Sequence, residues 1–220
     1  MYRCHTHVPK KILNNISKQY KGVVSVAEYL IERLKQKNIN TAFVSQYETS
    51  SKLIKPLSQT ADKIDKFELI FNKYEIAALY CAKTYTEYSN NMGVIINTTE
   101  FDFQDFTDVL CSSHPILSLC IYHSKPDLKE AIKNTSTIHP CFKQSCTIHN
   151  SAHFPNILEY MISLTEESPT APVHLNISSQ MLSENIILDN QHQNDLSFLE
   201  QCYEKDSQVH LSPSKNPPLL

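Results

Sequence analysis

A mostly apolar stretch followed directly by a helical pattern, over residues 67–85, restricts the fold more than any other feature of this sequence. Residues 67–71 form a short apolar run of strand length. From Tyr74 on, apolar and small residues recur at positions 74, 77, 78, 81, 82 and 85, which is one stripe of an α-helix. We therefore predict a buried strand that leads into a helix, with Asn72 as the N-cap and Glu75 in the first turn.

Glu75 has two interpretations at this point. A glutamate three residues after Asn72 can complete a capping box and interacts favourably with the positive end of the helix dipole. Alternatively, a carboxylate placed where a strand of a parallel sheet ends can meet a ligand, because α/β proteins bind ligands at that edge. The spacing alone favours the capping role, since acidic residues are common in first turns.

Strand-like and helix-like segments alternate along the body of the chain. Strands are expected at 40–45, 67–71, 92–97, 116–122 and 173–177, and helices at 25–37, 49–58, 74–88, 102–112 and 154–164. Such alternation is typical of an α/β fold with three layers, in which a mostly parallel sheet carries helices on both faces.

Four segments resemble a known domain in their order and spacing. Residues 24–34, 40–44, 74–78 and 172–177 are similar to the first helix, the first strand, the His-Glu-x-x-Ala helix start and the closing strand of one family. That family is the N-terminal pyrimidine-binding (PYR) domain of thiamine-diphosphate-dependent enzymes of the acetolactate synthase and pyruvate decarboxylase type. The resemblance spans about 22–178 and implies a six-stranded sheet, for which 144–148 is the only candidate for the sixth strand.

The resemblance also implies a site and a partner. The family's glutamate at the position of Glu75 hydrogen-bonds a ring nitrogen of the cofactor's aminopyrimidine, so Glu75 is the candidate catalytic and cofactor-binding residue, with thiamine diphosphate as the cofactor. The family dimerises around this helix, and small residues that allow close helix approach predict a homodimer here. They are Ala77, Ala78, Cys81 and Ala82.

Other parts of the family's site are missing from this sequence. The Gly- and Pro-rich loops of the family are replaced by residues 45–48, which include Glu48, and by 98–101, which include Glu100. The chain has only two glycines, Gly22 and Gly93, and no Gly-Asp-Gly motif. The family binds diphosphate and Mg²⁺ through that motif in a separate pyrophosphate domain. We therefore expect weak or lost binding of thiamine diphosphate, and no Mg²⁺ binding by this chain alone.

Composition excludes several other classes of protein. The net charge of −3 does not indicate a nucleic-acid-binding protein, which is typically basic. No run of apolar residues approaches the length of about 18 that a membrane-spanning helix needs. Seven cysteines, an odd number without a C-x-x-C pair, are typical of reduced thiols in an intracellular protein, so we expect a cytoplasmic location. The wealth of Asn, Ile and Lys suggests an AT-rich genome, such as that of a large DNA virus, for which a virion location is an alternative.

Three regions are expected along the chain: a basic arm at 1–21, a PYR-like α/β domain at 22–182, and a partly disordered tail at 183–220. Five ligand-type residues gather between positions 139 and 153, but their spacing matches no standard zinc pattern, so we predict no metal site there. They are His139, Cys141, Cys146, His149 and His153.

Three functions are consistent with these features, and one of them, a basic-armed virion or assembly component, rests only on residues 1–21 and the composition. The first is a stand-alone, diverged PYR-like domain without catalytic activity of its own, a pseudoenzyme that acts through self-association or a protein partner. The alternative is the PYR subunit of a split 2-oxo-acid decarboxylase or synthase, active as a lyase or transferase only in complex with a pyrophosphate-domain chain.

Overall fold

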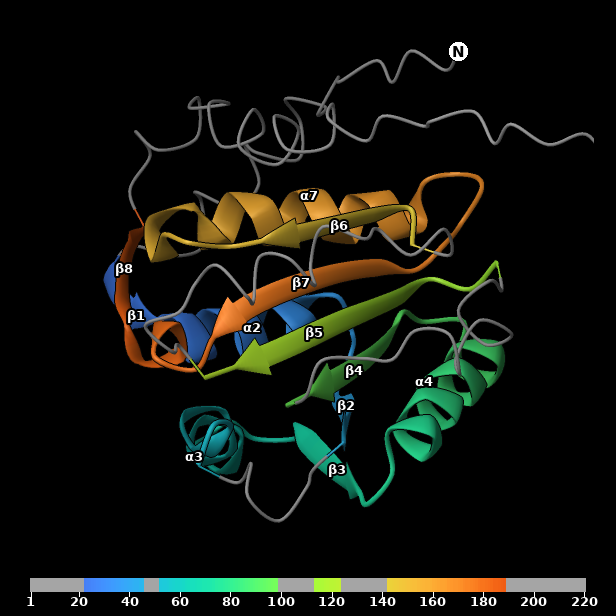
Figure 1. Cartoon of the computed structure of the whole chain (residues 1–220), viewed down its shortest axis with the longest axis horizontal. Helices are drawn as coiled ribbons and strands as arrows, with labels where there is room; N and C mark the ends of the chain where they lie inside the picture. The colour runs from blue at the N-terminus through green and yellow to red at the C-terminus, as the bar shows by residue number, and fades with distance from the viewer. Residues whose placement is uncertain (1–21, 46–51, 99–112, 124–141, 189–220) are drawn as a thin grey trace, which may run out of the picture.

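The fold is built on a six-stranded sheet in which every strand is parallel to its neighbours (Figure 1). The computed structural model describes residues 22–45, 52–98, 113–123 and 142–188. In spatial order the strands are β3 (Glu68–Asn72), β2 (Thr41–Ser45), β4 (Gly93–Asn97), β5 (Ile116–Tyr122), β7 (Val173–Ser178) and β6 (Gln144–Thr147). The predicted α/β sheet is confirmed, including its sixth strand, which forms at β6.

Four helices cover the two faces of this sheet (Figure 1). Those on one face are α2 (Val26–Gln36), α3 (Lys55–Lys63) and α7 (Phe154–Glu166), and α4 (Glu75–Ser89) lies on the other. Beneath the first three helices the strands contribute buried apolar side chains such as Val94, Leu119 and Leu175. Burial of one such side chain stabilises the fold by about 1.5–3 kcal/mol, so this face supplies most of the hydrophobic stabilisation.

Small residues allow α4 to lie very close to β4. Ala78 and Ala82 are fully buried against the sheet, together with Phe43 and Ile95. A Cβ atom on Gly93 would stand 2.5 Å from the carbonyl oxygen of Ala82, so any side chain at this position would push the helix away. Ala78 and Ala82, which we expected at a dimer interface, are therefore used for packing within the chain.

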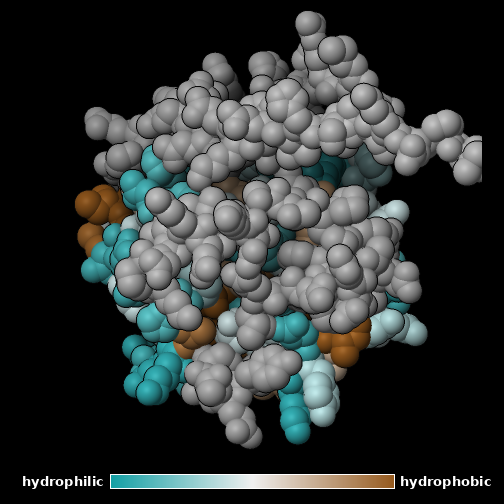
Figure 2. Space-filling model, in the orientation of Figure 1, coloured by the Kyte–Doolittle hydropathy of each residue, from teal (hydrophilic) through white to brown (hydrophobic). Residues whose placement is uncertain are grey.

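A short antiparallel ribbon, which the sequence analysis did not anticipate, lies beside the main sheet. It pairs β1 (Gly22–Ser25) with β8 (Asn185–Leu188), so that residues more than 160 positions apart meet. β8 falls within the segment that we assigned to the tail. Val23 and Ile187 oppose each other on the outer side and are 63% and 65% exposed, and Figure 2 shows hydrophobic surface at this edge.

Two local predictions were wrong. Asn72 does not cap α4: it ends β3, its Nδ2 donates to the carbonyl oxygen of Ile70 at 3.1 Å, and its Oδ1 accepts from Cys81 Sγ at 3.9 Å. Tyr74, in an extended conformation, is the N-cap instead, so Glu75 is the first helical residue.

The helix expected at 49–58 begins only at Lys55, because Pro56 favours the first helical turn. The helix expected at 102–112 lies outside the described residues.

Candidate functional site

The order of the strands reverses between β2 and β4. The chain leaves β2 for β3 on one side and then returns through α4 to β4 on the other side. In parallel α/β sheets, ligands bind at such a reversal, in the crevice outside the carboxyl ends of the strands. Ser45 and Asn97 are the last residues of β2 and β4, so both lie at this crevice, which we call the β2–β4 mouth.

Polar or small side chains cross the sheet near this carboxyl edge. We call them the polar row, which in spatial order consists of Asn72, Ser45, Asn97, Cys120, Asn176 and Thr147. Residues in register on a parallel sheet point to the same face, and this is the face that carries α4, since Phe43 and Ile95 point to it two residues earlier. Parallel sheets are normally apolar on both faces, so a polar row is a departure that indicates a specific role.

Ser45 and Asn97 form a buried pair within this row. The Ser45 hydroxyl donates to Asn97 Oδ1 at 2.8 Å, and neither residue is more than 1% exposed. The Thr98 hydroxyl donates to the carbonyl oxygen of Ser45 at 3.4 Å and so links the two strand ends again. Asn97 Nδ2 is buried and has no hydrogen-bond partner in the part of the chain that the structure describes, a state that costs about 1–3 kcal/mol.

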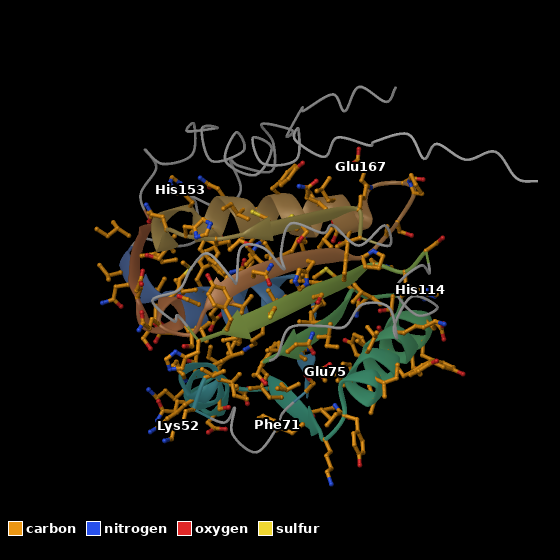
Figure 3. The ribbon with its side chains drawn as sticks, in the orientation of Figure 1. Lys52, Phe71, Glu75, His114, His153 and Glu167 are labelled. Carbon is orange, nitrogen blue, oxygen red and sulfur yellow. The ribbon has the colours of Figure 1, made fainter. Side chains whose placement is uncertain are left out.

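Glu75 lies at the same level of the molecule as this pair. It shares one helical face with Ala78, Leu79 and Ala82, which pack on the sheet, and Figure 3 shows it on the side of α4 nearest the strands. α4 runs from the carboxyl end of β3 back to the start of β4. One turn back from Leu79 therefore moves about 5 Å towards the carboxyl edge, as do the two strand residues that lead to Asn97. Glu75 consequently faces the β2–β4 mouth.

The carboxyl group of Glu75 is partly removed from water. Burial raises its pKa above the ordinary value, because the charged form loses solvation. A carboxyl in this position can accept a hydrogen bond when ionised and donate one when protonated. The sequence predicted Glu75, and the structure adds Ser45 and Asn97 at the carboxyl ends of the strands that flank the reversal.

The other end of the polar row is a continuous chain of hydrogen bonds. His174 Nδ1 lies 3.0 Å from Ser118 Oγ, and His174 Nε2 lies 3.0 Å from Asn176 Oδ1, while Asn176 Nδ2 donates to Thr147 Oγ1 at 3.4 Å. Burial lowers the pKa of His174 to about 4, and the hydrogen bond to Asn176 acts in the opposite direction. The ring is therefore neutral, accepts from Ser118 and donates to Asn176.

Exposed apolar residues lie next to the mouth, on the edge strand β3 and on the outer side of α4. This surface, the α4–β3 patch, consists of Ile70, Phe71, Tyr74, Ile76 and Tyr80, which are 37–58% exposed. Figure 2 shows hydrophobic surface over α4. β3 also ends the sheet, so one side of its backbone is unpaired with any described strand.

The Cys and His residues near position 150 give no metal site within the described ranges. His139 and Cys141 lie outside these ranges, and no three His, Cys, Asp or Glu residues inside them are placed to hold an ion. Cys81 carries a free thiol. None of the helices in the described segments has the length and apolar character needed to cross a membrane.

Comparison with known families matches part of the chain to one family. Residues 24–127 match the family described as thiamine pyrophosphate enzyme, N-terminal TPP binding domain. This segment is a PYR-type domain of the thiamine pyrophosphate enzymes. The family recognised from the sequence is thus confirmed, while no curated protein matches the chain in a sequence comparison.

Solved structures of similar fold are much longer than this chain. A thiamine diphosphate-dependent 4-hydroxybenzoylformate decarboxylase from Rhodococcus jostii RHA1 is 14% identical, with a TM-score of 0.64, over 74% of this chain and 32% of the decarboxylase chain. A protein from Mycobacterium smegmatis assigned as thiamin diphosphate-dependent is 13% identical, with a TM-score of 0.61, over 73% of this chain and 32% of its own. The PYR-type domain thus spans about a third of either protein, and at this identity the likeness concerns the fold.

Sequence reasoning missed Ser45 and Asn97, although a signal for them exists. Both are polar residues that end otherwise apolar strands, at positions that fall in register. The signal becomes specific only when the strand order is known, because the order alone shows that β2 and β4 flank the reversal.

Proposed function

We propose that this PYR-type domain has no catalytic activity alone and acts by associating with another protein surface, either a second copy or a chain with a pyrophosphate domain. The α4–β3 patch is the observation that supports this proposal. Exposed apolar residues gathered on neighbouring elements are typical of protein interaction sites, and here they lie on β3, the strand next to β2, and on α4. A partner on this patch could therefore also close the mouth and remove Glu75 further from water.

Self-association through this patch predicts a homodimer in solution. Because Ala78 and Ala82 are buried inside the chain, the contact would use the outer residues of α4, such as Ile76 and Tyr80, together with Phe71 on β3. Sedimentation velocity on the wild type should give twice the monomer mass of 25.2 kDa. Tyr80→Glu and Phe71→Ser should give the monomer.

Ile187→Ser is the matched control, because Ile187 is equally exposed on the β1–β8 ribbon, away from the patch. This variant should remain a dimer. A wild type that stays monomeric at high concentration would contradict self-association and leave a different chain as the partner.

The site fits the ring half of thiamine diphosphate better than the whole cofactor. Glu75 and Asn97 would hold the pyrimidine ring, and the bound cofactor would supply the carbanion-stabilising chemistry typical of thiamine diphosphate. A hydrogen bond to a charged group contributes about 1.5–3 kcal/mol, against an association cost of at least about 4 kcal/mol. With the diphosphate in water, we expect binding near or above the millimolar range that about −4 kcal/mol implies.

The second candidate is the PYR subunit of a split thiamine-diphosphate-dependent decarboxylase or synthase. It is favoured by the half-buried Glu75, whose raised pKa suits a group that exchanges a proton with a ligand. Titration calorimetry with thiamine diphosphate and Mg²⁺, on the wild type and on Glu75→Gln, separates the two candidates. Micromolar binding that the substitution abolishes would favour the split enzyme; millimolar or absent binding, with no decarboxylation of 2-oxo acids, would support the non-catalytic domain.

A further inference from the structure

Asn97 holds a hydrogen-bond donor that the fold itself does not use. Its Oδ1 is fixed by the Ser45 hydroxyl at 2.8 Å, so the amide orientation is set and Nδ2 is the group left over. Asn97 is 0% exposed, and Nδ2 has no hydrogen-bond partner among the described residues. Native proteins pair the great majority of buried polar atoms, so an exception indicates a function or a missing ligand.

Packing does not explain an asparagine at this position. The preceding residues of β4, Val94, Ile95 and Ile96, are all buried and β-branched. A threonine would fill a similar volume, suit a strand better and still offer an oxygen to Ser45. Asn97 therefore keeps a donor at the β2–β4 mouth at a cost in stability.

We propose that Asn97 is a ligand-positioning residue whose Nδ2 donates a hydrogen bond to an acceptor atom, a ring nitrogen or a carbonyl oxygen, of a flat heteroaromatic ligand at the β2–β4 mouth. The opposite edge of the same ring meets the Glu75 carboxyl. The identity of the ligand as a pyrimidine of the thiamine type rests on the proposed function. Ser45 acts through Asn97, because its hydroxyl holds the amide oxygen and so aims Nδ2.

Hydrogen bonds from Asn97 and Glu75 to opposite edges of one ring make the site selective for the atoms at those edges. A ring with an acceptor on the side of Asn97 satisfies the buried donor, whereas a ring with C–H at that position leaves it unpaired. Sites built in this way discriminate strongly against analogues that lack the matching atom. The class of ligand that fits is therefore an aminopyrimidine or a ring with the same acceptor pattern.

NMR titration of the full chain, labelled with ¹⁵N, tests this role directly. Thiamine diphosphate is added to about 10 mM, because the expected affinity is in the millimolar range. The Asn97 side-chain NH₂ signals, identified by their loss in Asn97→Thr, should shift on titration, together with the backbone amide of Ile76 beside Glu75. Asn97→Thr should bind about five- to tenfold more weakly, as expected for one lost neutral hydrogen bond.

The stability of the ligand-free protein gives a second measurement. A structural role for Asn97 predicts a loss of stability in Asn97→Thr, whereas a role in ligand binding predicts none. Asn97→Thr removes an unpaired buried donor, so its thermal midpoint should stay unchanged or rise. The matched control is Asn176→Thr at the same level of β7, whose amide is fully paired: it should lower the midpoint and leave the affinity unchanged. If Asn97→Thr does not fold, Asn97→Ser retains a hydroxyl for Ser45 and replaces it in both measurements.

The outcomes separate this inference from the proposed function. If Ile76 shifts while the Asn97 signals stay fixed and Asn97→Thr binds like the wild type, the role of Asn97 is overturned and the pyrimidine site stands. If no signal at the mouth moves, both the ligand and the role of Asn97 fail. A large loss of stability in Asn97→Thr and Asn97→Ser without ligand would show that Asn97 is structural.

Discussion

Two asparagines of the polar row, in equivalent places on β4 and β7, have opposite hydrogen-bonding states. Asn176 uses both ends of its amide, accepting from His174 and donating to Thr147. Asn97 uses only its oxygen, towards Ser45. Both side chains are buried, so water does not account for the difference. One half of the row therefore stabilises the sheet, while the other half, at the strand reversal, keeps a donor that no described residue uses.

The comparison predicts where substitutions should harm stability and where they should harm binding. Within the β5–β7–β6 chain every removed group leaves a former partner unpaired, which costs about 1–3 kcal/mol each time. At the β2–β4 mouth the unpaired donor already exists, so its removal should cost the fold little.

His174→Ala should destabilise the protein most. The substitution leaves a cavity in a closely packed layer and deprives both Ser118 and Asn176 of a partner, so we expect a loss of about 3–5 kcal/mol. Urea denaturation followed by circular dichroism measures it. Tyr88→Ala, at a position that is 85% exposed, is the control and should change the unfolding free energy by about 0.5 kcal/mol or less. A similar small effect for His174 would mean that the chain contributes little.

The stability of the protein should fall with decreasing pH because of His174. Its pKa is about 4 in the folded protein against 6.5 for the ordinary residue, so between these values the unfolded state binds more protons. Stability is therefore complete above pH 6.5 and falls by up to about 3 kcal/mol as the pH drops to 4.

His174→Gln should remove most of this slope in denaturation curves measured between pH 4 and 7. Glu75 contributes with the opposite sign, since a raised carboxyl pKa makes the folded state hold its proton more tightly. The comparison is therefore best made in a Glu75→Gln background. An unchanged slope in His174→Gln would contradict the buried neutral imidazole.

The sequence predicted the architecture well, because the architecture depends on patterns of apolar residues. The alternation of strands and helices gave the layers, and even the weak segment at β6 formed a strand as expected. The start of α4 was harder to predict, because it depends on which groups the Asn72 side chain bonds to. Asn72 bonds to Ile70 and Cys81 rather than to the helix, a choice set by tertiary contacts.

The candidate site was only half visible in the sequence. Glu75 stands out because it follows a strand and begins a helix. Ser45 and Asn97 are 52 positions apart, and only the strand order brings them together. The missing partner of Asn97 Nδ2 is a property of three-dimensional packing, which no spacing in the sequence can express.

The next largest change in stability is expected from substitution of the two asparagines, Asn176 and Asn97. Asn176→Thr should lower the unfolding free energy by about 2 kcal/mol, because His174 Nε2 and Thr147 lose their partner together. Asn97→Thr is the same chemical change on β4, two strands away from Asn176, and its effect should lie between no loss and a gain of about 1 kcal/mol. Equal losses in the two variants would erase the distinction between the two halves of the row.

Ser45→Ala should have a small effect on stability and still reveal how the mouth works. The variant removes the hydroxyl that fixes Asn97 Oδ1, so the amide loses its one partner and is free to rotate. A net loss of about 1 kcal/mol is expected in urea denaturation, which is the usual value of one hydrogen bond. Because a rotating amide no longer holds Nδ2 in one direction, the affinity for thiamine diphosphate should also fall, by less than in Asn97→Thr. In the double variant Ser45→Ala/Asn97→Thr the affinity should match that of Asn97→Thr alone, since Ser45 acts only through Asn97. Independent, additive losses in the double variant would show that Ser45 contacts the ligand itself, and would move the boundary of the site from β4 to β2.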